Sequence, residues 1–123
     1  MYQSGVCNIG PAEIARRRRA GHVGLVTALA LFAVLLAIGA PPLARVLVAL
    51  PAAMAATGYL QARFKFCVGF GSAGVFNFGA TGPTEQVVEV TARARDRARA
   101  LRIWLASVAI GLGAGIVSAL LPL

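Results

Sequence analysis

The stretch 21–61, GHVGLVTALALFAVLLAIGAPPLARVLVALPAAMAATGYLQ, decides the fold, because two apolar runs meet there at the pair Pro41-Pro42. Each run has the roughly 20 residues that an α-helix needs to cross the hydrocarbon of a bilayer. A third apolar run, 101–123, has the same length and character. We therefore predict an all-α membrane protein with three transmembrane helices, at about 21–40, 42–61 and 101–122.

The composition supports a single integral membrane domain, residues 1–123. Hydrophobic residues make up 59% of the chain and charged residues only 13%, which is too apolar for a soluble domain of this length. We expect the first apolar run to remain as a helix rather than to be removed as a signal peptide. It is long for a signal sequence and ends in Ala40-Pro41-Pro42 instead of a small-residue cleavage site.

The basic residues predict the orientation of the chain. All twelve Lys and Arg residues except Arg45 lie before the first span, after the second or before the third. In a three-span chain these positions are on the same side of the membrane, and positive charge marks the cytoplasmic side. We expect a bacterial inner-membrane protein with a cytoplasmic N-terminus and an external C-terminus, in which Arg45 snorkels to the outer interface. The formal charge of +8 is then explained by anionic lipids, worth about 1 kcal/mol per basic residue, and not by nucleic acid. The predicted lipid head-group contacts are Arg16, Arg17, Arg18, Arg19, Arg63, Lys65, Arg97, Arg99, Arg102 and Trp104.

Prolines mark the expected helix boundaries. Gly10-Pro11-Ala12-Glu13 predicts that a helix begins at Pro11 within a cytoplasmic segment, 1–20, and either continues into the first span or bends at Gly21. The short connection at Pro41-Pro42 forces an antiparallel hairpin. Pro51 is expected to kink the second helix, whose small residues allow another helix to approach closely.

The segment 62–100 is predicted to be cytoplasmic or interfacial. Its part 64–82 contains five of the six phenylalanines and many glycines, so it is too broken for a spanning helix and too apolar for a solvated loop. We expect it to lie at the interface or to be partly re-entrant, covered by protein. A new helix is predicted to begin after 81–85, with Thr or Gly as its cap, and to continue through the Arg-rich stretch into the third span.

The third span carries small residues at every fourth position. Ser107, Gly111 and Gly115 therefore share one face, which predicts close helix packing. We expect this face to hold a partner, so that Gly111→Leu or Gly115→Leu would release it.

Chemically reactive side chains are scarce. The chain has one His, two Cys and four acids, and no acid lies inside a predicted span, which argues against a pump or channel. His22 is expected to be a surface imidazole beside four arginines, and we predict no metal and no cofactor. Cys7 and Cys67 are the candidate thiol pair, because nearby cations favour thiolates and their segments are expected to meet at the membrane surface.

The motif Cys7-Asn8-Ile9-Gly10-Pro11-Ala12-Glu13-Ile14-Ala15-Arg16, followed by a hairpin and Phe66-Cys67, resembles the YgaP-type transmembrane domain over about residues 8–79. The resemblance implies a small inner-membrane hairpin whose cytoplasmic end is shaped by Asn8, Gly10 and Cys67. Some members of that family are fused to a rhodanese domain, which carries sulfur as a persulfide. The family's usual Cys-Pro pair is Cys67-Val68 here, and the third helix lies outside the resemblance.

These observations predict a non-catalytic accessory or assembly subunit of a larger membrane complex, in contact with lipids and either a partner or further copies of itself. One alternative is a membrane thiol protein in sulfur, persulfide or redox handling through Cys7 and Cys67. A second alternative is a small oligomeric transporter, for which the spans offer few polar side chains.

Overall fold

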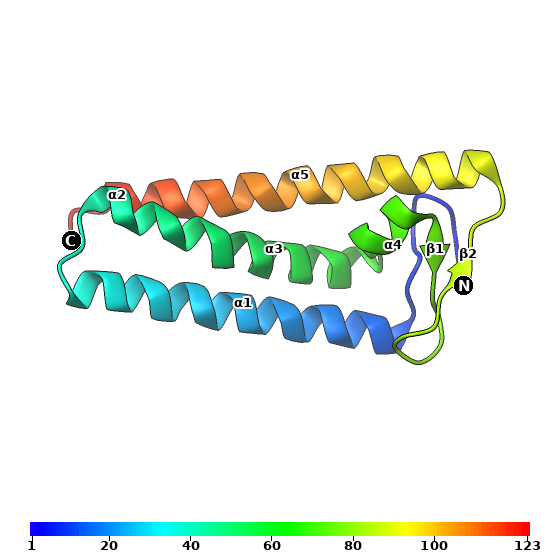
Figure 1. Ribbon diagram of the computed structural model, residues 1–123, viewed down its shortest axis with the longest axis horizontal. Helices are drawn as coiled ribbons and strands as arrows, with labels where there is room; N and C mark the ends of the chain where they lie inside the picture. The colour runs from blue at the N-terminus through cyan, green and yellow to red at the C-terminus, as the bar shows by residue number, and fades with distance from the viewer.

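The computed structural model describes residues 1–123 and places three long helices side by side, joined at alternate ends (Figure 1). The helices that are long and apolar enough to cross a membrane are Pro11–Ala37, Pro42–Phe64 and Val90–Leu120. This confirms the mostly helical class with three apolar helices. The full order of elements is α1 (Pro11–Ala37), α2 (Pro42–Arg45), the 3₁₀ turn η1 (Val46–Val48), α3 (Ala49–Phe64), α4 (Val68–Ala73), β1 (Val75–Phe76), β2 (Glu85–Gln86) and α5 (Val90–Leu120).

Helix α1 begins at Pro11, as predicted. Gly10 is the N-cap residue, Pro11 occupies the first turn, and Glu13 supplies an acid near the positive end of the helix dipole. The helix runs without a break through Gly21 into the apolar stretch. Gly21 is therefore not a bend. It is a contact point, because a Cβ there would lie 2.8 Å from the ring of Tyr59.

The second span is distorted just before Pro51. Its first helical residues, α2, pass into the 3₁₀ turn η1 before α3 starts at Ala49. Proline has no N–H to donate and its ring displaces the carbonyl four residues earlier, here that of Leu47. A tightened 3₁₀ turn at that carbonyl is the expected response, and it gives the predicted kink its observed form.

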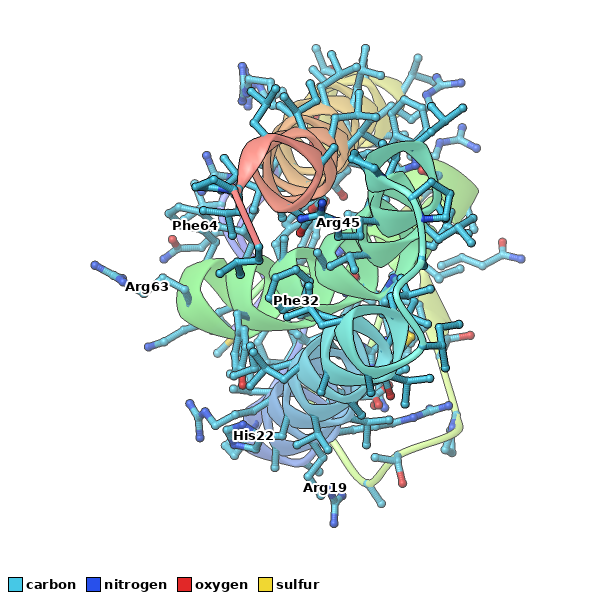
Figure 2. All side chains as sticks on the ribbon, turned by 90° about the vertical axis from the view of Figure 1, so that its left-hand side faces the viewer. Arg19, His22, Phe32, Arg45, Arg63 and Phe64 are labelled. Atoms are coloured by element: carbon cyan, nitrogen blue, oxygen red, sulfur yellow. The ribbon has the colours of Figure 1, made fainter.

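Helix α3 lies between α1 and α5 in both views (Figures 1 and 2). The main helix contacts of the molecule are those of α1 with α3 and of α3 with α5. Small residues allow these close approaches: a Cβ on Gly24 would meet the backbone of Ala55, and one on Gly58 would lie 2.7 Å from the carbonyl of Arg17. The three helices thus form a layer with α3 in the middle.

The irregular segments gather at the end of the layer that holds the N-terminus (Figure 1). Here β1 and β2 pair antiparallel, with Val75 opposite Gln86 and Phe76 opposite Glu85. Helix α4 packs on α5, and Phe66, just before it, is fully buried. The Phe-rich and Gly-rich segment is therefore folded onto the rest of the chain.

The predicted start of the last helix is wrong. A helix was expected directly after 81–85, but Glu85–Gln86 form β2, and α5 begins only at Val90 with Glu89 as its N-cap residue. Tertiary pairing outweighs the local signal, because the N–H of Val87 donates to the carbonyl of Gly74 at 2.8 Å and Val87 is buried. From Val90 onward the helix runs unbroken through the Arg-rich stretch into the apolar run, as predicted.

Candidate functional site

Asn8 joins the N-terminal segment to the turn between α3 and α4. Its side-chain oxygen accepts a hydrogen bond from the N–H of Cys67 at 2.7 Å, and its amide nitrogen donates to the carbonyl of Cys67 at 3.1 Å. Its own backbone N–H donates to Lys65 and its carbonyl accepts from Asn77. Asn8 is completely buried. Its side-chain amide pairs with the backbone of Cys67 as a neighbouring strand would, and this holds the N-terminal segment against the turn before α4. We call Asn8, Glu13, Arg17, Cys67 and Asn77 the polar cluster.

Glu13 and Arg17 form the charged centre of the polar cluster. They lie one turn apart on α1, and Arg17 Nη1 donates to Glu13 Oε1 at 2.8 Å. The Glu13 side chain has no exposed surface, and its second oxygen accepts from Asn77 at 3.4 Å. The carboxylate is therefore satisfied by partners from two different segments.

Arg17 also contacts the thiol of Cys67. Its Nη2 donates to Cys67 Sγ at 2.9 Å, and its guanidinium lies 5.1 Å from the centre of the Phe70 ring. The N–H of Phe70 reaches the same sulfur at 3.4 Å, so Cys67 caps α4. The sequence predicts a lipid head-group contact for Arg17, but only 11% of its side chain is exposed. The guanidinium turns inward because Glu13 lies one helical turn away.

The two cysteines face different partners. Both are free thiols; Cys67 is buried and Cys7 is partly exposed. The segments that carry them do meet, because Asn8 binds the backbone of Cys67. The thiol of Cys7, however, donates to the carbonyl of Met1 at 3.1 Å, away from the Arg17 contact. The structure thus brings the segments together without pairing the two sulfur atoms.

A second polar group lies around Asp96, on the first half of α5. The carboxylate is fully buried and accepts from the Tyr2 hydroxyl at 2.6 Å and from the N–H of Gly5 at 2.7 Å. Tyr2 also stacks on Phe76, with ring centres 4.7 Å apart. Burial, and then the Asp96 carboxylate, raise the pKa of the Tyr2 hydroxyl. Tyr2 therefore remains a proton donor to Asp96.

Most of the predicted head-group residues are exposed. Arg17 and Arg99 are the two that are not exposed. Arg99 is half-buried, and its guanidinium lies 4.8 Å from the centre of the Phe64 ring. Arg16 lies 3.7 Å from Glu13 but keeps 61% of its side chain exposed. The exposed members are Arg16, Arg18, Arg19, Arg63, Lys65, Arg97, Arg102 and Trp104.

The small-residue stripe packs inside the chain. Ser107, Gly111 and Gly115 are buried, and a Cβ on Gly111 would lie 2.8 Å from the carbonyl of Ala49 in the second span. One on Gly115 would lie 2.9 Å from the carbonyl of Val46. The expected partner on this face is therefore α3 and η1 of the same chain, and Gly111→Leu would first disturb the fold.

His22 and Arg45 are paired in ways the sequence did not indicate. His22 Nδ1 shares a 2.7 Å hydrogen bond with the Tyr59 hydroxyl, and no group of three or more His, Cys, Asp or Glu side chains comes together as a metal site. Arg45, expected to snorkel outward, is buried between the end of α5 and α3 (Figure 2). Its Nη1 donates to the carbonyls of Ser118 and Leu121 at 2.9 and 3.0 Å. The carbonyl of Ser118 belongs to the last turn of α5, where carbonyls lack a donor within the helix and the dipole is negative. That of Leu121 also accepts from the N–H of Leu123 at 2.9 Å.

An apolar groove runs along α3 between α1 and α5. It has a volume of about 530 Å³, and all but one of its lining residues are hydrophobic. Alanines supply much of its surface. Its lining residues are Leu25, Ala28, Leu29, Phe32, Val48, Ala52, Ala55, Ala56, Tyr59, Leu60, Ile110, Ala114, Val117 and Ser118.

Sequence reasoning missed Asn77, Asp96 and Tyr2 as structural partners. Only two of the contacts of these polar groups could have been anticipated from neighbouring residues in the sequence. Glu13 and Arg17 have the i, i+4 spacing of a helical ion pair, and Asp96 is the one acid within an Arg-rich stretch. Comparison of the chain with protein-family models, with curated proteins and with solved structures finds no match.

Proposed function

We propose that this protein is a small, non-catalytic membrane subunit that works by packing against a larger complex. The observation that carries the proposal is the apolar groove along α3, which would receive a transmembrane helix of the partner. A groove of about 530 Å³ with an almost wholly apolar lining has little to orient a small polar substrate. Its hydroxyl groups, those of Tyr59 and Ser118, are already hydrogen-bonded to His22 and to the carbonyl of Ala114.

The small side chains of the groove support a helix as its occupant. Ala28 of α1, Ala52 and Ala55 of α3 and Ala114 of α5 all line it. In a bilayer, helices associate through close van der Waals contact, and small residues permit that contact. The small residues Ser107, Gly111 and Gly115 of α5 already pack within the chain. The groove is therefore the surface that we assign to the partner.

The hydroxyl groups of the spans favour packing over transport. Thr27, Thr57, Ser107 and Ser118 each donate to the carbonyl four residues earlier on their own helix, at 2.7 to 2.8 Å. A hydroxyl that bonds back to its helix is not free to bind a passing solute. This weakens the small oligomeric transporter as an alternative.

We further propose the bacterial inner membrane as the location, with a cytoplasmic N-terminus. The exposed arginines and Lys65 belong to the start of α1, the end of α3 and the first half of α5. These parts share the half of the layer that holds the N-terminus (Figure 1), and positive charge is retained on the cytoplasmic side. A phosphatase that is active only outside the cytoplasm, fused after Leu123, should be active. The same enzyme fused before Met1 should be inactive. The reverse pattern would contradict this orientation.

The groove is tested by filling it. Ala114→Phe places a ring in the groove and should release the partner during extraction in mild detergent, as measured by quantitative mass spectrometry of what co-purifies. Ala109→Phe is the matched control, because Ala109 lies exposed on α5 and outside the groove. Equal retention of the partner by both variants would contradict the proposal. If only a second copy of this chain or only lipid is recovered with the wild type, the groove binds that occupant and the proposal of a larger complex is wrong.

A second candidate function is thiol chemistry, favoured by the contact of Arg17 with Cys67 Sγ at 2.9 Å. The sulfur also accepts from the N–H of Phe70, and a cysteine sulfur held by two donors in a defined place is suited to covalent modification, such as persulfidation. The resemblance of residues 8–79 to YgaP-type hairpins points the same way and stays a prediction. Mass spectrometry of the extracted protein should then find Cys67 modified and Cys7 unmodified. Unmodified Cys67 under sulfur or oxidant stress would argue against this function.

A further inference from the structure

A second cavity, of about 600 Å³, lies between the N-terminal segment and the ends of α3 and α5 nearest to it. Its lining differs from that of the groove, because it combines apolar walls with three cations. Ile14 and Phe78 are among the apolar side chains, and Arg63, Lys65 and Arg99 are the cations. We call this cavity the basic pocket.

The three cations of the basic pocket have no acidic partner. The ion pairs of the molecule both belong to Glu13, which binds Arg16 and Arg17. The other buried acid, Asp96, is satisfied by Tyr2 and Gly5. No Asp or Glu lines the basic pocket, so its positive charge is uncompensated.

An aromatic ring holds two of the cations in place. The guanidiniums of Arg63 and Arg99 lie 5.9 and 4.8 Å from the centre of the Phe64 ring, within the range of a cation–π contact. They come from different helices, α3 and α5. Figure 2 shows Arg63 and Phe64 on the same side of the molecule. The ring thus brings together donors that are far apart in the sequence.

Arg99 also carries an unused donor. Its Nε is buried and has no hydrogen-bond partner, and a buried donor without an acceptor costs free energy. A ligand with several acceptor oxygens would satisfy it. Phosphate oxygens fit the planar, multi-donor guanidinium well, and Lys65 adds a compact positive charge.

We propose that the basic pocket binds the phosphate of an anionic phospholipid, with Arg63, Lys65 and Arg99 as its ligands. A lipid is favoured over free phosphate because the apolar walls of the pocket suit an amphiphile and because Arg63 and Lys65 directly end an apolar span. The site goes beyond the proposed packing function, and it depends only on membrane insertion. It would fix the depth and rotation of α3 and α5 at this surface.

The test measures lipid retained by the purified full chain in native mass spectrometry. The protein is incubated in detergent with phosphatidylglycerol or, separately, with phosphatidylcholine of the same acyl chains. The wild type should retain phosphatidylglycerol about tenfold more strongly. Both lipids carry the phosphate, but the choline cation of phosphatidylcholine is repelled by the three cations of the basic pocket. Equal retention of both lipids would overturn the proposal.

Variants separate the pocket from general surface charge. Arg63→Gln and Arg99→Gln should each weaken phosphatidylglycerol retention about tenfold. Arg18→Gln and Arg102→Gln remove the same charge from exposed positions outside the pocket and should change it little. Phe64→Leu keeps the charge but removes the ring, and it should weaken retention by a smaller factor. Equal losses in pocket and control variants would overturn the site.

A competition experiment distinguishes binding of a whole lipid from binding of free phosphate. Inorganic phosphate at millimolar concentration should fail to displace phosphatidylglycerol from the wild type. Displacement by phosphate as effective as that by a short-chain phosphatidylglycerol would overturn the assignment to a lipid. Circular dichroism and gel filtration of each variant establish that it is folded before its lipid retention is compared.

Discussion

The two halves of the molecule are held together by opposite means. In the apolar half, α1, α3 and α5 touch through small residues, as where Gly111 meets Ala53, and the hydroxyl groups bond back to their own helices. At the N-terminal end, fully buried carboxylates accept hydrogen bonds from side chains of distant segments, Glu13 from Asn77 and Asp96 from Tyr2.

The difference shows how each half would fail. Packing over small residues depends on volume, and added atoms have no place to go. A buried polar network depends on complete pairing, and a removed atom leaves a partner unsatisfied. Substitutions that enlarge a residue should therefore damage the apolar half, and substitutions that shorten a residue should damage the polar end.

The largest expected effect is Glu13→Ala. It leaves the Arg17 guanidinium and the Asn77 amide without their carboxylate, and losing one partner of a buried ion pair costs about 3–5 kcal/mol. The free energy of unfolding, from a denaturant titration in detergent, measures this. Glu85→Ala, at an exposed position in β2, should stay within about 0.5 kcal/mol of the wild type. Similar losses in both variants would mean that the polar cluster does not stabilise the fold.

Gly58→Ala is expected to cost somewhat less, up to about 3 kcal/mol, as overpacking of a close contact does. The added methyl group would meet the backbone of Gly21 and the carbonyl of Arg17, and neither can move like a flexible side chain. Gly113→Ala is the matched control on α5, where a Cβ meets nothing within 4 Å. It should be neutral or more stable by up to about 1 kcal/mol through helix propensity. A neutral Gly58→Ala would refute close contact between α1 and α3.

Tyr2→Phe tests a single hydrogen bond of the polar end. The ring and its stacking on Phe76 remain, but Asp96 loses the donor at 2.6 Å. A hydrogen bond to a charged group is worth about 1.5 kcal/mol or more, and the unfolding free energy at neutral pH should fall by about this amount. No change would indicate that another donor reaches Asp96.

The smallest effect is in the pH dependence. The pKa of Tyr2 is raised by burial and by Asp96, so the folded protein keeps this proton where the unfolded chain releases it. Its contribution to stability is complete below the unfolded pKa of about 10 and is lost as the pH rises through the higher folded value. Unfolding midpoints measured from pH 8 upward should decline above pH about 10 more steeply in the wild type than in Tyr2→Phe. Parallel curves would contradict this linkage.

Some features followed from local sequence, and the structure agrees with them. Pro11 after Gly10 marks the start of α1, and Pro51 predicts the distortion that appears as η1. Other features required distant partners. Arg17 resembles its three arginine neighbours in sequence, yet it alone reaches Cys67, fifty positions away. Arg45 gave no sign that it would bind the carbonyls at the end of α5.

The sequence by itself determined three apolar helices, because span length and hydropathy are local properties of a run of residues. Only the tertiary structure decided which polar side chains turn inward. Glu85 and Gln86 became a strand and Asp96 a buried acceptor through segments brought beside them by the fold. The physical reason is that a polar group can be buried without a large free-energy cost only where a hydrogen-bond partner is present. That partner can come from any part of the chain.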